Sequence, residues 1–478
     1  VLLVWDSLAE LRRIPTPIAN QSAAGPNDND QFGDPEQTTF NQNFITSFSL
    51  IKGNTVFRPP DWEFRFTGVT NLNYSLAKEN GILRANPAED SERRFDQHFA
   101  IQELFIDKHL WNKSDRYDFA SLRIGVHPFI SDFRGFLFQD QQPGVRLFGN
   151  FINNRVQYNL AYFRRFNKDT NSGLNETELR DDEIYIANLY YQDFPVLGFQ
   201  LQGTVIYNKN REGSGKRNFN ENDVIVIPAS LGNEKPHDYD VVYFGFNGDG
   251  HFDRLNVTFS LYHALGTDER NQIADRKTDI NAFFGAFEGS VDFDWYRLKA
   301  YALFSSGDEN PLDSKAEGFD AIFENPQFAG FDTSFFQRQA IPLVGGGNVI
   351  LSGRNAFIPS LRSSKEEGQS NFVNPGIRMF GVGADFDILP ELRVIFNASY
   401  LDFDNTATLE FLRNQPSIDR HIGEDISCGI IYRPLFINNV MIRASVAGLF
   451  PGKGFDDLFD DGGDEFQYSA LANIILTY

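Results

Sequence analysis

Hydrophobic and polar residues alternate with a period of two along most of the chain. In residues 392–400 (LRVIFNASY) every second residue is apolar, and residues 199–208, 255–262 and 440–446 repeat the pattern. Such alternation predicts β-strands with one buried and one solvated face. The predicted strands run about 10 to 14 residues, longer than the five or six typical of soluble sheets and long enough for tilted membrane-spanning strands. No stretch of helical spacing exceeds two turns.

The connections between these strands are of two kinds that alternate along the chain. Short turns such as Gly53–Pro60 and Arg433–Asn439 are separated by long polar connections such as Ala77–Asp96, Gly266–Lys277 and Ser305–Val373. This order is typical of an up-and-down barrel with short periplasmic turns and long extracellular loops. A soluble Greek-key sandwich has no reason to alternate in this way.

The end of the chain sets the direction and the number of the strands. The last predicted strand, Phe466–Tyr478, has apolar residues at alternate positions and ends on an aromatic residue. It resembles the C-terminal signature of bacterial outer-membrane proteins. Counting back gives about 17 strands from Phe40, and the even number typical of bacterial barrels requires Val1–Arg12 as one more. We therefore predict an all-β fold: one closed, antiparallel, up-and-down transmembrane β-barrel of about 18 strands over residues 1–478.

Composition supports a membrane barrel and excludes several other classes of protein. The 478 residues include 49 Phe but only 2 Met, and a mean hydropathy of -0.36 with no long apolar run excludes transmembrane helices. The excess of aromatic residues suits two girdles at the membrane interfaces. A formal net charge of -22 argues against a nucleic-acid partner. The single cysteine, Cys428, excludes an intrachain disulfide and a cysteine-held metal cluster.

The basic residues are not spread evenly over the two faces of the predicted strands. Because a charge facing lipid at mid-depth costs about 2–4 kcal/mol, the apolar face is assigned to lipid and the other face to the lumen. A surplus of guanidinium groups in a narrow aqueous pore favours carboxylates, phosphates or sulfates. The predicted pore-lining basic residues are Arg65, Arg123, Arg155, Arg165, Lys299, Arg393 and Arg443. The alternative is that these residues pair with acids such as Glu63, Asp385 and Asp425 and only fill the wall.

Two connections contain enough apolar residues to fold inward and constrict the pore. Ser305–Val373 is far longer than ordinary loops and carries several Phe residues. Pro128–Gln142 is too apolar for a solvated loop. The basic candidates in these two constriction loops are Arg134, Arg338, Arg354 and Arg362. The alternative for the longer loop is an outer cap packed over the rim.

Reactive motifs are absent from the sequence. The seven histidines do not have metal-ligand spacing, and neither a zinc-protease motif, a nucleophile elbow nor a phosphate-binding loop occurs. We expect no cofactor, no metal site and no enzymatic activity. A hydrolase assembled at the rim, for example from His421 and Ser427, is the enzyme alternative. The acidic run from Asp456 to Glu465 could hold Ca²⁺ or Mg²⁺ near lipopolysaccharide phosphates, although a solvated loop explains it equally.

Three segments give the chain a resemblance to a known family. They are Gly53–Asp61 (GNTVFRPPD), Arg123–Arg146 (RIGVHPFISDFRGFLFQDQQPGVR) and Leu361–Gly376 (LRSSKEEGQSNFVNPG). With them, the chain resembles the alginate-export family of 18-stranded bacterial outer-membrane barrels. The resemblance implies a gated aqueous path for a polyanionic polysaccharide, or a channel for another cargo.

Together these observations predict a passive, porin-like channel in the outer membrane of a Gram-negative cell, in contact with lipid and lipopolysaccharide. Its expected cargo is an anionic solute or an anionic polysaccharide. The alternative is a barrel that sheathes a periplasmic or cytochrome partner in an electron conduit. A sheath requires a wide bore without inward loops, whereas a solute channel requires a constriction.

Overall fold

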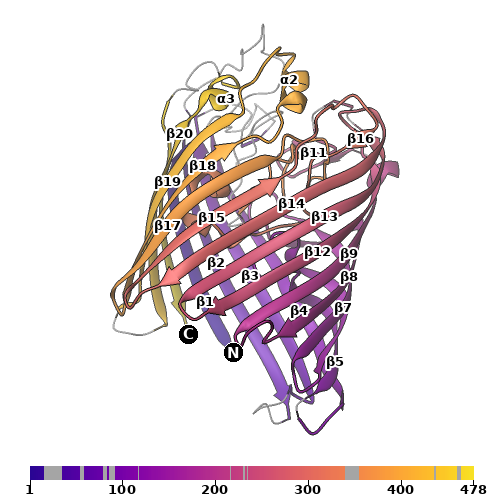
Figure 1. Cartoon of the computed structure of the whole chain (residues 1–478), viewed down its shortest axis with the longest axis vertical. Coiled ribbons are helices and arrows are strands. Elements are labelled where there is room, and N and C mark those ends of the chain that lie inside the picture. Colours follow the sequence, from indigo (N-terminus) through magenta and orange to yellow (C-terminus); the bar gives the residue numbers. More distant parts are fainter. Residues whose placement is uncertain are drawn as a thin grey trace.

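A closed sheet of 18 long strands forms the wall of the molecule (Figure 1). The computed structural model describes residues 1–14, 35–53, 59–78, 83–84, 92–116, 118–215, 217–229, 232–233, 235–339, 355–434, 438–459 and 465–478. The wall strands are β1 Leu2–Arg13, β2 Glu36–Lys52, β3 Trp62–Ala77, β4 Arg93–Asn112, β5 Phe119–Ile130, β6 Gln139–Phe151, β7 Val156–Lys168, β8 Asn175–Gln192, β9 Phe199–Arg211, β12 Asp238–Phe252, β13 Leu255–Asn271, β14 Arg276–Asp292, β15 Tyr296–Ser305, β17 Ile377–Leu389, β18 Leu392–Asp402, β19 His421–Tyr432, β20 Val440–Pro451 and β21 Gln467–Thr477.

The two ends of the chain close the barrel. Strand β1 pairs antiparallel with β2 on one edge and with β21 on the other, from Val4 opposite Thr477 to Arg12 opposite Ser469. The Leu3 backbone N–H also donates to the Tyr478 carbonyl over 3.0 Å. The prediction that the first residues form a wall strand is confirmed, and closure leaves the sheet without a free edge.

Several of the short elements lie toward the end of the barrel opposite the two termini (Figure 1). A two-residue strand, β16 Lys315–Ala316, pairs with β14, and β10 Asn218–Phe219 pairs with β11 Ile225–Ile227. The helices are η1 Glu212–Ser214, η2 Phe331–Thr333, α1 Phe335–Gln339, α2 Ala407–Arg413 and α3 Lys453–Asp456. None of the helices in the described part of the chain is long and apolar enough to span a membrane.

The predicted alternation of faces is confirmed along the strands. On β2, Phe40, Phe44 and Phe48 point outward and are 45%, 45% and 38% exposed. The alternate residues Asn41 and Asn43 point inward and hydrogen-bond to a neighbouring side chain. Strand β2 is therefore apolar on its outer face and polar on its inner face.

Several predicted loop boundaries are wrong because the strands are longer than expected. The connection predicted as Gly266–Lys277 shrinks to residues 272–275, since β13 continues to Asn271 and β14 begins at Arg276. Strand β4 reaches 20 residues. Strand pairing continues into the outer loops because it satisfies backbone hydrogen-bonding groups there as well.

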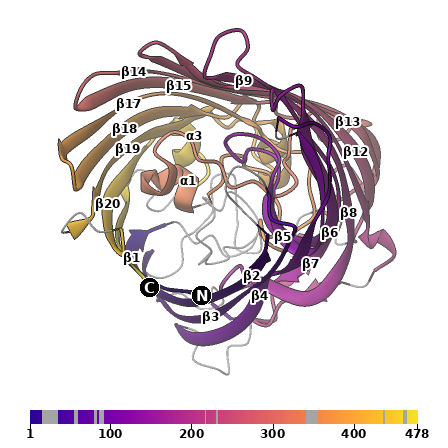
Figure 2. The ribbon, with the colours of Figure 1, turned by 90° about the horizontal axis from the view of Figure 1, so that it is seen from below.

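Connections of the chain fold into the interior of the barrel (Figure 2). The segment between β5 and β6 and the long connection between β15 and β17 lie inside the ring of strands. They pair with each other where the Phe323 backbone N–H donates to the Leu137 carbonyl over 3.1 Å. Aromatic rings from both segments join the inner wall in one buried cluster that includes Phe136, Phe284 and Phe328. Inward folding of both predicted constriction loops is thus seen in their described parts.

The two faces of β2 predict opposite responses to a new charge. In phospholipid vesicles, Phe44→Arg should lower the free energy of unfolding by about 2–4 kcal/mol, because the guanidinium would face lipid. The adjacent Asn43→Arg points inward and should lower it by less than about 1 kcal/mol. Urea unfolding of the two variants measures both values. Equal losses would show that the faces are assigned wrongly.

Candidate functional site: a cavity in the lumen

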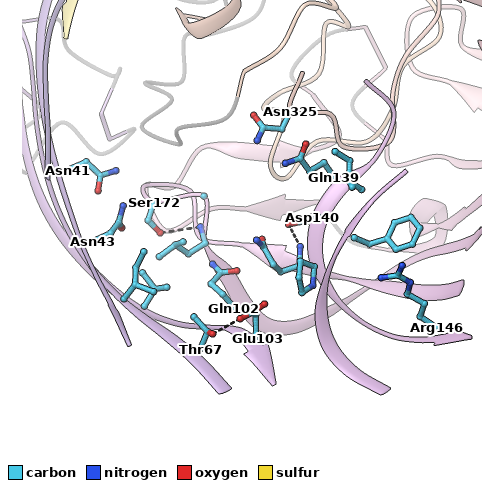
Figure 3. Close-up of a pocket in the computed structure, with 18 of the residues that line it drawn as sticks. Asn41, Asn43, Thr67, Gln102, Glu103, Gln139, Asp140, Arg146, Ser172 and Asn325 are labelled. Atoms are coloured by element: carbon cyan, nitrogen blue, oxygen red, sulfur yellow. Dashed lines mark hydrogen bonds between the residues drawn. The ribbon is translucent and has the colours of Figure 1, made fainter. Parts of the chain in front are cut away.

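A cavity of about 760 Å³ lies inside the barrel between one side of the wall and the inward loops. Its wall residues come mainly from strands β2 to β8, and Asn325 comes from the long connection. Figure 3 shows Arg146 on one side of the cavity and Asn41 and Asn43 on the other. The volume lies within the range of about 300–1,000 Å³ that is typical of small-molecule sites.

A β-bulge shapes the floor of this cavity. Thr67 on β3 pairs with Glu103, and the next residue, Gly68, pairs with Ile101, so Gln102 is an extra residue on β4. Both Gln102 and Glu103 consequently line the cavity, although neighbours on a regular strand point to opposite faces. Before the bulge the even-numbered residues of β4 face inward, and after it the odd-numbered residues do.

Three arginines and two phenylalanines stack along the inner face of β3 to β6. The guanidinium carbons of Arg65 and Arg123 lie 5.6 and 4.4 Å from the centre of the Phe105 ring. Those of Arg123 and Arg146 lie 5.5 and 4.6 Å from the centre of the Phe148 ring. Each ring therefore contacts two cations, an arrangement that holds the guanidinium groups in a row.

The first two arginines of this row have carboxylate partners. Arg65 lies 2.7 Å from Glu63, and Arg123 lies 2.8 Å from Asp107. The alternative that lumenal arginines pair with wall acids therefore holds at these two positions. Their charges are largely compensated locally.

Arg146 differs from the other two arginines of the row. Its Nε and Nη2 atoms donate to the neutral amide oxygen of Asn159 over 2.8 and 2.5 Å. Among the described residues, no carboxylate oxygen lies within 4.0 Å of its guanidinium group, whose carbon lies 5.2 Å from the centre of the Phe129 ring. Arg146 was not among the predicted pore-lining residues, although its alternation with Val145 and Leu147 indicates an inward direction.

The two carboxylates that line the cavity are held by other groups. Asp140 lies 2.8 Å from the Lys168 ammonium, and both side chains are fully buried. Glu103 accepts a hydrogen bond from the Thr67 hydroxyl and lies 4.0 Å from Arg65. Arg146 is therefore the cation of the cavity wall without a local counter-charge among the described residues.

Three of the other predicted pore-lining residues lie on the inner face outside this row. Lys299 lies 2.8 Å from Asp385, which confirms the pairing alternative there. Arg393 lies 2.7 Å from Asp387 near the turn between β17 and β18. Arg443 lies on β20 opposite Asn473 of β21.

Arg155 and Arg165 were also predicted to line the pore, but the structure places neither on an exposed part of the inner wall. Arg155 lies in the turn between β6 and β7, where it donates to the Asp193 carbonyl at the end of the barrel. Arg165 is only 1% exposed because it pairs with Asp182 and because Phe323 of the long connection covers it, 4.9 Å from its guanidinium carbon.

The inward segment between β5 and β6 is organised by one carboxylate. Asp132 accepts backbone N–H groups from Gly135 and Leu137 over 2.6 and 3.2 Å, and the Tyr262 hydroxyl of β13 over 2.9 Å. Arg134, a predicted constriction residue, extends from this segment to within 3.5 Å of Glu288 on β14. The segment therefore crosses to the opposite wall and is attached there.

The long connection is attached inside the barrel by polar contacts. The Asp425 carboxylate on β19 accepts the Ser334 hydroxyl over 2.6 Å and the Phe336 backbone N–H over 2.9 Å. Arg338 of α1 lies 3.2 Å from Glu10 on β1. Asp425 was a partner for a wall arginine only in the pairing alternative, and here it anchors the loop.

Of the remaining constriction candidates, Arg362 supports the long connection from within. It is 2.8 Å from Asp320, and it also donates to the Ala321 carbonyl. Arg338 and Arg362 thus hold the loop in place. Arg354 lies outside the described residues.

The outer part of the long connection docks on a neighbouring wall loop. The Thr170 hydroxyl, between β7 and β8, donates to the Glu367 carboxyl over 2.9 Å. Burial raises the pKa of Glu367 to about 8, so the protonated form is favoured in the docked loop.

Candidate chemistry outside the cavity is limited in the described part of the chain. Carboxylate oxygens of Asp96, Asp169 and Glu221 lie within 4.8 Å of one another, a set that local sequence spacing does not reveal because three separate segments supply it. His421 bonds to Asp402, whereas Ser427 contacts the Thr333 hydroxyl. The rim hydrolase therefore gains no support. Part of the acidic run between residues 456 and 465 lies outside the described residues.

Comparisons with known proteins find the fold but no family. No family model matches the sequence, and no curated protein is similar to it. The structures of Pseudomonas aeruginosa OccK9 (OpdG) and OccK7 (OpdD) are each similar with a TM-score of 0.53 at 12% identity, over 100% of this chain and 98% of theirs. Acinetobacter baumannii OccAB2 is similar with a TM-score of 0.51 at 11% identity, again over 100% and 98%. The similarity shows a shared 18-stranded barrel fold, and the resemblance to the alginate-export family gains no support.

Removing the Asp132 carboxylate should release the inward segment. Asp132→Ala leaves several buried N–H groups without acceptors, so amide hydrogen exchange at residues 134–137 should accelerate by about tenfold or more. Tyr262→Phe removes only one of the bonds and should accelerate exchange less. Unchanged exchange in Asp132→Ala would contradict the assigned role.

Docking of the long connection should depend on pH through Glu367. The carboxyl has a pKa of about 8 in the docked loop against 4.5 ordinarily, so its contribution to docking is complete below pH 4.5 and is lost as pH rises through 8. Proteinase K should therefore cleave residues 355–376 faster above about pH 8 than in acid, after correction for protease activity. Glu367→Gln should reduce this acceleration, and Glu309→Gln, at an exposed position, should retain it. An unaltered pH response in Glu367→Gln would exclude Glu367 as the titrating group.

Proposed function

We propose that the chain is a passive outer-membrane channel that admits small anionic solutes over Arg146. The apolar exterior suits a barrel in a lipid bilayer, and the cavity beside the inward segments suits a hydrated path through it. The solved structures with the same fold are outer-membrane porins, which supports a channel in the same membrane.

The inward segments favour a small solute over a protein partner. A sheath around a cytochrome needs a free bore, but the segment between β5 and β6 crosses to β13 and β14, and α1 lies against β1 and β19. A cavity of about 760 Å³ remains beside these segments. We therefore favour a channel over a sheath, and small anions over a polysaccharide.

The observation that carries the choice of anions is the environment of Arg146. Its positive charge lines the cavity, contacts aromatic faces and a neutral amide, and has no carboxylate within 4.0 Å among the described residues. An uncompensated cation in a narrow site of low dielectric attracts anions and repels cations. Arg65 and Arg123 lie along the same wall, and because each is paired with a carboxylate, each attracts anions more weakly than Arg146.

Replacing Arg146 should reduce anion selectivity. In planar bilayers with asymmetric KCl, the wild-type reversal potential should favour Cl⁻, and Arg146→Gln should reduce the ratio of Cl⁻ to K⁺ permeability by about three- to tenfold. Arg155→Gln removes the same charge from the turn at the barrel end and should change the ratio little. A cation-selective wild type, or equal effects of the two variants, would contradict the proposed function.

A further inference from the structure

An apolar groove of about 540 Å³ crosses the outer surface of the barrel where the chain closes on itself. It lies over β19, β20, β21, β1 and β2. The two termini lie beside each other at this part of the wall (Figure 2). Leu11, Phe40 and Val446 border the groove and are 54%, 45% and 59% exposed, so the groove faces the lipid side of the wall and is separate from the lumenal cavity.

A row of three alanines forms the floor of this groove. Ala9 of β1 lies opposite Ala472 of β21, and Ala472 lies opposite Ala444 of β20. Phe40 pairs with Ala9 at one end of the row, and Ile430 pairs with Ala444 at the other end. The next outward residues along these strands are larger and form the sides of the groove: Leu11, Val446, Ile442 and Ile474.

The same row contributes little side-chain packing to the contact that closes the barrel. Cross-strand pairs of large side chains stabilise a sheet relative to Ala–Ala pairs. Where β1 meets β21, Ala9 and Ala472 form an Ala–Ala pair on the outer face, and the neighbouring Leu11 lies opposite Ala470. A molecule that fills the groove would therefore supply the packing that the alanines leave out of the closing contact.

The direction and the length of the alanine row match one fatty-acyl chain. Four spacings of about 4.8 Å between neighbouring strands give a row of about 19 Å. The row descends across the wall, because Phe40 lies close to Glu36 at the end of β2 away from the termini, whereas Ile430 lies close to Tyr432 at the opposite end of β19. With strands tilted by about 45°, the descent is about 13 Å, close to the roughly 15 Å of one leaflet of the hydrocarbon core.

We infer that this groove binds one acyl chain of lipid A, the lipid part of lipopolysaccharide, and that the chain supports the closing contact between β1 and β21. Lipopolysaccharide forms the outer leaflet, and the groove comes nearest to that leaflet at β2. There the hydroxyl of Thr38, which lines the groove opposite Leu11, donates to the carbonyl of the acyl group. The inference goes beyond the proposed channel function and does not depend on its anion selectivity.

The shape of the groove favours an acyl chain over a second copy of the protein. In a twofold contact the same surface faces itself, so the groove would lie against a groove and leave a void. Atoms that line a void lose van der Waals contacts, whereas a flexible acyl chain follows the alanine row. Hydrocarbon is also the expected surroundings of the outward residues beside the groove, such as Phe44 on β2, which is 45% exposed.

Native mass spectrometry of the full chain, folded in detergent, tests the site with hexa-acylated lipid A as the probe. The wild type should retain one lipid A molecule. Ala472→Phe and Ala444→Phe fill the groove, and each should reduce the retained fraction by about fivefold or more. Ala398→Phe adds the same ring to the outward face of β18, outside the groove, and should retain lipid A as the wild type does. Folding of each variant is checked by the heat-dependent gel shift of the barrel.

Three results of this experiment would overturn the inference. The first is full retention of lipid A in both folded groove variants. The second is equal retention of a dioleoyl phospholipid by the wild type, which would assign the groove to any membrane lipid. The third is a dimer of the wild type that both groove variants dissociate, which would assign the groove to a second copy of the chain.

Amide hydrogen exchange tests the effect of the lipid on closure. In the wild type, lipid A should slow exchange by about threefold or more at residues 4–12 and 469–477, where β1 and β21 pair. Exchange in β7 and β8, which do not line the groove, should stay the same. In Ala472→Phe the slowing should be lost. Equal slowing in β7 and β8, or no slowing at the closing contact, would overturn the role in closure.

Discussion

Every strand of this sheet must pair on both edges, and the rest of the structure depends on that requirement. An unpaired backbone group in hydrocarbon costs several kcal/mol, so a spanning sheet is stable only when it closes. Here the contact between β1 and β21 completes the ring. Closure turns the two faces of the strands into an apolar outer surface and an inner surface that carries both polar and aromatic residues. It also creates an interior that must be either hydrated or filled.

The interior meets this second requirement in two ways. At one level, aromatic residues of the inward segments pack against the wall, and Asp132 and Asp425 bind the backbone that accompanies them. Beside this packing, the cavity remains polar and most of its charges are neutralised by neighbours such as Lys168. Arg146 is the exception in the described part of the cavity wall, and selectivity for anions is proposed to originate there.

Sequence patterns predicted the architecture because strand alternation and turn length are local properties. The same patterns could not show that Phe323 covers Arg165 or that Asp425 binds Ser334, since residues far apart in the sequence make these contacts. The bulge at Gln102 shifts the alternation of β4 without a local signal such as glycine. Arg146 was overlooked for a related reason: its significance lies in the absence of a carboxylate partner among the described residues, which only the arrangement of β5 to β7 reveals.

The central claim is that anions pass through the cavity in contact with Arg146. A crystal of the protein soaked in NaBr, measured at the bromine absorption edge, would locate bound anions by their anomalous signal. The account predicts a bromide peak beside Arg146 within the cavity, and the loss of that peak in crystals of Arg146→Gln. Bromide bound at other lumenal arginines, with no peak at Arg146, would contradict it.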